Sequence, residues 1–283
     1  MSDRPPAWRV RAARVGRAST GLLVALLLWW LVTDVVAAPG DMLARFSPLT
    51  AAPAIVALFL DGAGLVHVSV TLERLLAGIA IATLVGVPVG VAVGLSRRLA
   101  DYTGALFQFL RMVSPLAWTP IAIVLLGVGD LPVVFLVAVA AVWPVILGAA
   151  AGVHALDPGW LQIATTLGAS RRERLTTIVL PGIRAHLATG LRVALGTAWI
   201  VIVPAEMLGV DSGLGYAILD ARDRLRYDEL MGVVLVIGLL GFALDGVAQR
   251  TSARQRRRRH TRPAAPDAAI EVIEAPVDLA RTR

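Results

Sequence analysis

Long apolar stretches separated by short polar segments make up most of the chain. Residues 75–96, 112–129 and 131–153 contain no charged side chain, and residues 21–38, 186–208 and 230–250 contain only one or two. Each stretch reaches about the 18 to 20 residues with which a helix crosses a hydrocarbon core roughly 30 Å thick. The pattern predicts an all-α integral membrane protein with six transmembrane helices.

A compact polar insert, residues 157–181, separates the fourth and fifth apolar stretches. Asp157 followed by Pro158 is typical of a helix start. Apolar side chains then recur at offsets of three, four and seven, which places Trp160, Ile163, Ala164 and Leu167 on one helical face. Gly168 tolerates the positive φ that often ends a helix. We therefore expect a short helix that ends at this glycine.

A second short helix is predicted directly after the glycine. Ser170 and Glu173 have the spacing of a capping box. Leu175, Ile178 and Val179 give the helix an apolar face, and Pro181 is expected to end it. Two short helices joined at a glycine corner, just outside a membrane, would suit docking of a cytoplasmic partner. The alternative is an ordinary amphipathic loop between two spans.

The charge distribution predicts the orientation in the membrane. All 27 basic residues are arginines, and the net charge is +7. Arginines gather before the first apolar stretch and after the second, fourth and sixth, in the segments 4–17, 97–98, 171–184 and 254–259. This is the positive-inside pattern, so both termini are expected in the cytoplasm and no nucleic-acid partner is expected. The arginine run near the C-terminus could contact anionic lipid headgroups.

Three spans carry features beyond apolarity. In the second, Ala82, Gly86, Gly90 and Gly94 form a stripe of small residues that predicts close packing against another helix. The third is interrupted at Ser114-Pro115 and again at Thr119-Pro120, and broken helices at membrane depth usually border protein or a water-filled cavity. Ser114 and Trp118 are therefore candidates for lining a translocation pathway, with kinked packing as the alternative.

The fifth span places Arg192, Trp199 and Glu206 at seven-residue intervals, on one stripe. Arg192 and Glu206 are about 21 Å apart along a helix, too far to pair with each other. Ionisable groups in a membrane usually face the bundle interior or water. We predict pathway or gate roles for Trp199, Glu206 and Met207 and a structural role for Arg192. Asp245, in the sixth span, is expected to be paired or interfacial.

The polar insert resembles the cytoplasmic coupling loop of bacterial ABC-importer permeases. That loop carries E-A-A, three residues, glycine, nine residues and I-x-L-P. Here Gly168, Ile178, Leu180 and Pro181 keep this spacing, whereas the E-A-A positions hold Gln162, Ile163 and Ala164. The flanking stretches 114–130 and 189–225, with P-L-A-W-x-P and A-W…A-E-M-L, resemble permeases of the nitrate/sulfonate/taurine class.

The resemblance implies a type I ABC-importer permease with cytoplasmic coupling helices. It implies a cytoplasmic segment 1–20, a permease domain 21–250 with its coupling loop at 154–185, and a disordered cytoplasmic tail 251–283. The implied partners are a second permease copy, an ABC ATPase subunit, an extracytoplasmic solute-binding protein and membrane lipid. The residues implied to contact the ATPase are Gln162, Ala164, Leu167, Gly168, Ala169, Ser170, Ile178, Leu180 and Pro181.

The sequence contains no nucleotide-binding or hydrolytic motif. It has no lysine to complete a P-loop, no H-E-x-x-H, no G-x-S-x-G and no cysteine, and its four histidines are scattered. We therefore expect a transport subunit that binds no cofactor or metal and does no covalent chemistry, and the resemblance implies that a partner uses ATP and that the solute is a small anion. An ion-coupled secondary transporter is the alternative, although paired membrane carboxylates and inverted repeats are not evident. An intramembrane hydrolase lacks a base near Ser114.

The first apolar stretch has a second interpretation. A basic leader, an apolar core and the small residues Val36-Ala37-Ala38 would also suit a cleaved secretory signal peptide. The apolar core is long, and the remaining spans require a start on the inside. We therefore expect a retained helix at the plasma membrane.

Overall fold

The computed structural model describes residues 20–21, 23–38 and 41–260, with side chains up to residue 250. All regular structure in these ranges is helical, which confirms the expected all-α fold. The N-terminal helix, Leu23–Val36, ends in the π-helical η1 (Leu31–Val36). The elements that follow are η2 (Met42–Phe46), α2 (Pro48–Leu60), α3 (Ala63–Leu95), α4 (Arg97–Met112), η3 (Pro115–Trp118), α5 (Thr119–Leu126), α6 (Asp130–His154), α7 (Pro158–Thr166), α8 (Arg171–Glu173), η4 (Arg174–Val179), α9 (Leu180–Glu206), α10 (Leu214–Asp223) and α11 (Tyr227–His260).

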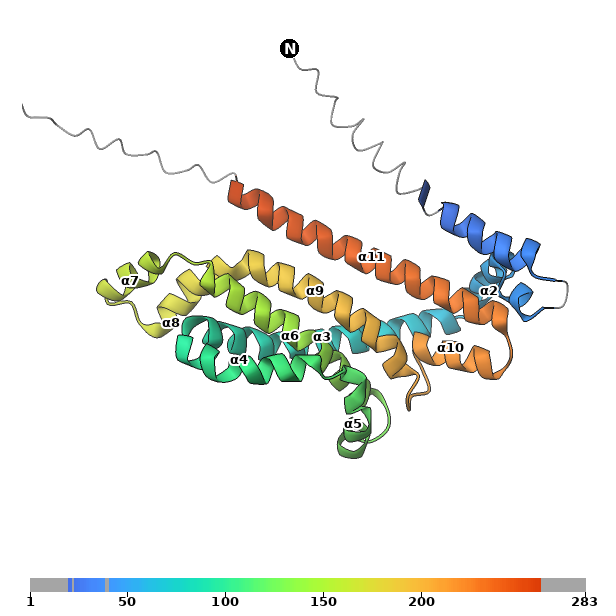
Figure 1. Ribbon diagram of the computed structural model, residues 1–283, viewed down its shortest axis with the longest axis horizontal. Helices are drawn as coiled ribbons and strands as arrows, with labels where there is room; N and C mark the ends of the chain where they lie inside the picture. The colour runs from blue at the N-terminus through green and yellow to red at the C-terminus, as the bar shows by residue number, and fades with distance from the viewer. Residues whose placement is uncertain (1–19, 22, 39–40, 261–283) are drawn as a thin grey trace, which may run out of the picture.

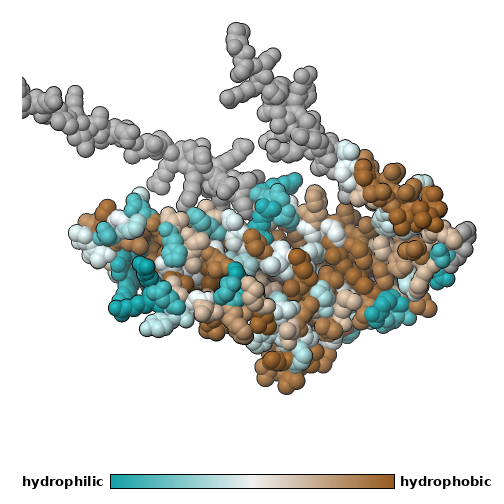
Figure 2. All heavy atoms as spheres, viewed as in Figure 1, coloured by the Kyte–Doolittle hydropathy of each residue, from teal (hydrophilic) through white to brown (hydrophobic). Residues whose placement is uncertain are grey.

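The long helices run along the longest axis of the molecule (Figure 1). The α7–α8 loop lies at one end of this axis, and α2 and α10 lie at the other, while α5 projects to one side. Hydrophilic residues gather at the α7–α8 end and over α10, with mainly hydrophobic surface between them (Figure 2). This distribution matches a protein that crosses a membrane along its long axis.

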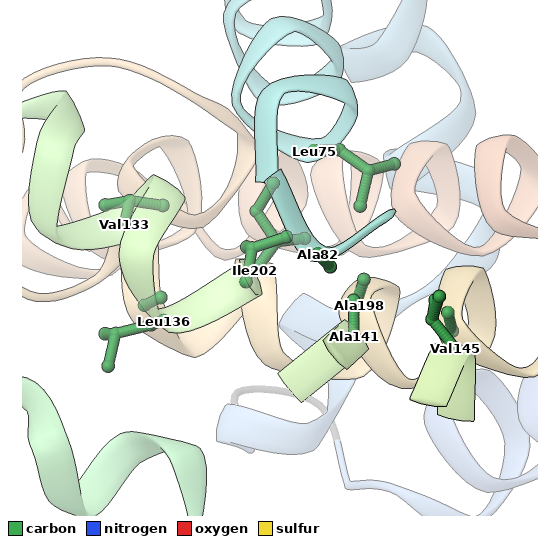
Figure 3. Close-up of a cluster of buried hydrophobic side chains, with 11 residues drawn as sticks. Leu75, Ala82, Val133, Leu136, Ala141, Val145, Ala198 and Ile202 are labelled. Atoms are coloured by element: carbon green, nitrogen blue, oxygen red, sulfur yellow. The ribbon is translucent and has the colours of Figure 1, made fainter. Parts of the chain in front are cut away.

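The core is formed where α3, α6 and α9 pack together. Leu75 and Ala82 of α3 meet Val133, Leu136, Ala141 and Val145 of α6 and Ala198 and Ile202 of α9 (Figure 3). The predicted small-residue stripe allows this approach: a Cβ on Gly90 would lie 2.4 Å from the carbonyl oxygen of Ile146. Close packing of the stripe is therefore confirmed, and its partner is α6.

Four helices are long and apolar enough to cross a membrane: α3, α6, the helix Arg171–Glu206 and the part of α11 from Tyr227 to Arg250. A fifth crossing is obtained if α4 and the helix Pro115–Leu126, which meet at 88°, are taken together. Leu23–Val36 and Pro48–Leu60 are shorter apolar helices. The count of six spans stays a prediction.

The third apolar stretch, residues 112–129, is interrupted at Ser114-Pro115, as the prolines predict, and η3 gives way to α5 at Thr119. The amphipathic helix α4 begins after Ser96, whose side chain accepts from the Leu99 N–H, and it ends at Met112. Ser114, directly before Pro115, is non-helical (φ −58°, ψ 130°), as expected because a proline disfavours helix at the preceding residue. The remainder of the stretch forms η3 and α5.

The predicted end of the second loop helix at Pro181 is wrong. The helix that starts after Ser170 continues through η4 into α9 and reaches Glu206. Over Arg174–Val179 the turns widen, and the Leu180 N–H donates to the Leu175 carbonyl, five residues back. A π-helical segment changes the hydrogen-bond register just before the proline, so the missing N–H of Pro181 does not end the helix.

Helix α11 continues to His260, ten residues past the expected end of the permease domain at residue 250. The expected disorder of the tail stays a prediction. The expectations for residues 1–19 and 261–283 lie outside the described residues.

Candidate functional site

The α7–α8 loop has the corner that the sequence predicts. The Asp157 carboxylate accepts from the Gly159 N–H at 2.8 Å and caps α7. Gly168 has φ +75°, and the Ala169 N–H donates to the Ala164 carbonyl at 2.9 Å, which closes the turn. Ser170 and Glu173 form the expected reciprocal capping box. These local hydrogen bonds fix the angle between α7 and the helix that follows.

The loop is anchored on one side and exposed on the other. Leu161, Leu175 and Val179 pack into one cluster with Val153 at the end of α6, and the Arg174 guanidinium donates to the Thr165 hydroxyl at 2.9 Å. On the face that does not pack against α6, Trp160, Ile163 and Leu167 are 63%, 62% and 80% exposed. Exposed apolar side chains clustered at a polar end of a molecule commonly mark an interaction surface.

The structure places the other predicted coupling residues around this corner. Gln162 is exposed on α7, whereas Ala164 is buried beneath it. Ile178 is half-buried in η4, and Leu180 and Pro181 are exposed on the first turn of α9. Because η4 is continuous with α9, these last residues join the corner to the long core helix.

A buried ionic network lies at the opposite end of α9. The Arg74 side chain is 3% exposed, and its Nη1 donates to Glu206 Oε1 at 2.9 Å and to the Ser212 carbonyl at 2.8 Å. Arg74 Nε donates to Asp130 Oδ1 at 2.9 Å. The Thr71 hydroxyl lies 2.9 Å from Glu206 Oε1, and the Gly215 N–H donates to Glu206 Oε2 at 2.9 Å. The network thus joins α3, α6, α9 and the start of α10.

Sequence reasoning missed Arg74, which directly precedes the uncharged stretch 75–96. The available signal was an arginine well inside a helix that begins at Ala63, because a charge there requires a buried partner. Glu206, predicted as a pathway residue, has no exposed surface and supplies that partner. Arg192 pairs instead with Asp245, Nε to Oδ1 at 2.9 Å, so the expected pairing of Asp245 is confirmed.

A cavity of about 740 Å³ lies elsewhere. It opens to the surface and is lined by the end of α4, by η3 and by turns of α6 and α9. Most of its wall is apolar, and its polar lining side chains are Arg111, Trp143, His186, Thr189 and Thr197. None of the predicted pathway residues lines this cavity. Trp118 and Trp199 pack against the core, and Met207 follows the end of α9. Ser114 lies between the lining residues Val113 and Pro115. Their pathway roles stay predictions.

No group of three potential metal ligands occurs among the residues that the structure describes.

The family model for binding-protein-dependent transport system inner membrane components matches residues 82–259, more than half of the chain. The chain belongs to this family. As an inner membrane component of binding-protein-dependent transport, it is a multi-pass membrane transport subunit and not an enzyme.

Curated members of the family cover most of the chain. The bicarbonate transport system permease protein CmpB of Synechococcus elongatus is 33% identical over 84% of this chain and 88% of its own length. The taurine transport system permease protein TauC of Escherichia coli is 31% identical over 87% and 90%. The nitrate import permease protein NrtB of a Synechocystis strain is 27% identical over 83% and 87%. The resemblance to the nitrate/sulfonate/taurine class is therefore confirmed.

The fold is also that of a solved transporter chain. A chain from the MetNI methionine ABC transporter in an inward-facing form superposes with a TM-score of 0.56 over 66% of this chain and 94% of that chain. The sequence identity is 17%, so this likeness concerns the fold alone. It confirms the type I permease fold.

Proposed function

We propose that the chain is the translocating subunit of an ATP-driven importer for a small oxyanion or sulfonate. The names of the similar permeases include bicarbonate, nitrate and taurine, which share a compact anionic oxygen group. Two copies of this chain, an ABC ATPase bound at the α7–α8 loop and an extracytoplasmic solute-binding protein bound at the opposite end complete the assembly. Both termini lie in the cytoplasm, and lipid surrounds the apolar belt.

The observation that carries this proposal is the rigid corner at Gly168. Its exposed Trp160, Ile163 and Leu167 offer an apolar docking face without nucleotide-binding residues of their own. The helix that leaves the corner is continuous to Glu206, at the other end of the core. Displacement of the loop by a nucleotide-driven partner is thereby transmitted along one helix to the ionic network that holds α3, α6 and α10 together.

The proposal is tested by reconstituting the permease in proteoliposomes with the ATPase and the binding protein of its transport system. We expect uptake of bicarbonate, nitrate or taurine only when ATP and the ATPase are present. Uptake driven by a proton or sodium gradient without nucleotide would overturn the proposal and favour a secondary transporter.

Gly168→Trp tests the role of the corner in the same assay. A side chain at φ +75° is strained, and a bulky ring there displaces the partner's contact surface. We expect uptake to fall at least tenfold while membrane insertion is unchanged. Gly246→Trp is the matched control, because a Cβ at Gly246 in α11 has no neighbour within 4 Å and the site is far from the loop in sequence. Wild-type uptake by Gly168→Trp would contradict the docking role.

A further inference from the structure

The 740 Å³ cavity carries a single fixed charge in its described lining. Arg111, at the end of α4, is the one residue with a fixed charge in the described lining, which also includes His186, Thr189 and Thr197. A second cavity of about 350 Å³ adjoins the first and shares Arg111, Trp143, Leu147 and Ala151 with it. Neither described lining includes an aspartate or glutamate. Arg111 therefore stands where two cavities meet, and the described lining of neither cavity offers it a carboxylate.

The protein satisfies only a small part of the hydrogen-bonding capacity of Arg111. Among the described residues, its side chain makes one hydrogen bond, from Nη2 to the Gln108 amide oxygen at 2.9 Å. A guanidinium has five N–H donors and stays charged. His186 adds a second unused group, because its buried Nδ1 has no hydrogen-bond partner in the described structure. Arg111 is exposed, so its remaining N–H donors are accessible to a solute, and a fixed positive charge beside an apolar wall favours an anion as its partner.

The location of the cavities suits a binding site along a translocation path across the membrane. The large cavity lies over the middle of α6, from Ala140 to Ala151, and the small one continues to His154 at the end of α6 next to the α7–α8 loop. Arg111 is thus reached from the middle of the core helices and from the loop end. The predicted pathway residues lie outside both linings.

We propose that Arg111 is the anion-binding residue of the translocation path, with His186 as a second donor, and that it takes an oxyanion or sulfonate group. This inference rests on the proposed function and deepens it by naming the residue that selects for negative charge. A planar guanidinium binds two oxygens of a carboxylate-like, nitrate or sulfonate group at once. Because the rest of the wall is apolar, the bound anion makes few polar contacts. This suits a transport site, which must release its solute as well as bind it.

A binding measurement tests the site without requiring transport. The purified permease is heated with increasing nitrate, bicarbonate or taurine at constant ionic strength, with chloride as the reference salt. A ligand that binds only the folded protein raises the unfolding midpoint with concentration. We expect such a rise for the wild type and for Arg98→Gln, an exposed arginine of the same helix outside both linings, and no rise for Arg111→Gln. The same rise in Arg111→Gln, or no rise in the wild type with any of the three solutes, would overturn the proposal.

Transport by the full assembly separates anion selection from structural damage. We expect Arg111→Gln to reduce uptake about tenfold or more, in line with the loss of a charge-assisted hydrogen bond, while ATP hydrolysis by the assembly and its dimeric size persist. Arg111→Lys should retain part of the uptake because it keeps the charge. Equal loss of uptake and ATP hydrolysis in both variants, or dissociation into single copies, would show a structural role and overturn the proposal. If the wild type binds the anions but moves none of them, the proposed transport fails while the binding site stands.

Discussion

Arg74 and Glu206 are charged side chains with only 3% and no exposed surface, and 132 residues separate them in the sequence. Their pairing is supported by the Thr71 hydroxyl and by the Gly215 N–H, so the carboxylate accepts several hydrogen bonds. Gly213 permits this arrangement, because a Cβ there would lie 2.5 Å from the Glu206 carboxyl group. At this scale the Glu206 end of the core is held by one buried ion pair and by a loop that leaves room for it.

Removing the Arg74 guanidinium should destabilise the fold strongly, whereas removing the carboxylate of its exposed partner Asp130 should have little effect on stability. Arg74→Met leaves the Glu206 carboxylate buried without a cation, and we expect it to destabilise the fold by about 3 to 5 kcal/mol. Asp130→Asn removes a carboxylate that is 69% exposed, and we expect a loss of at most about 1 kcal/mol. Thermal unfolding midpoints in detergent give the comparison. Equal midpoints for the two variants would contradict the assigned network.

At the scale of elements, the contact between α3 and α6 depends on glycines at regular spacing. A Cβ at Gly78, Gly86, Gly90 or Gly94 would lie 2.4 to 2.8 Å from α6. The neighbouring atoms include the Ile146 carbonyl oxygen, which cannot move without displacing the helix backbone. Because apolar side chains gain little by leaving lipid, this close backbone packing is what binds the two helices.

Gly90→Ala tests this contact at a single methyl group. We expect a loss of about 1 to 3 kcal/mol in stability from overpacking. Gly238→Ala in α11 is the control, since its Cβ has no neighbour within 4 Å, and alanine there should be neutral or stabilising by about 0.5 to 1 kcal/mol. The measurement is the thermal unfolding midpoint of each variant, compared under the same conditions. A Gly90→Ala variant as stable as Gly238→Ala would mean that α3 and α6 are not in backbone contact.

At the scale of the whole molecule, one continuous helix links the α7–α8 corner to the ionic network at Glu206. The cavity with Arg111 lies beside the middle of this helix. In the proposed mechanism, a movement applied at the corner reaches both the cavity wall and the Glu206 end of the core. The proposal thus gives the loop a mechanical role, the cavity a selective role and the network an anchoring role.

The features that the sequence predicted correctly depend on neighbouring residues. The Asp157 cap, the positive φ of Gly168 and the Ser170 capping box each involve residues within a few positions of one another. The small-residue stripe follows from helical periodicity alone. Helix α4 was missed because it is amphipathic, and a search for uniformly apolar stretches passes over such a helix.

The features that the sequence did not predict depend on contacts between distant segments. Arg74 meets Glu206 only because α3 and α9 are adjacent in the fold. Continuation of the helix through Pro181 depends on widened turns that no residue type demands. The position of Arg111 depends on the fold, because α4, α6 and α9 together line a cavity whose described wall carries no carboxylate.

The most direct test of the account is where the corner lies and what it contacts. The chain has no cysteine, so Leu167→Cys introduces a single thiol on the exposed corner, and Asp223→Cys introduces one at the opposite end. We predict that the thiol at position 167 reacts only from the cytoplasmic side and crosslinks to the ATPase subunit, while the one at position 223 reacts only from outside. Labelling of position 167 from the outside, or the absence of any crosslink to the ATPase in the assembled transporter, would contradict the account.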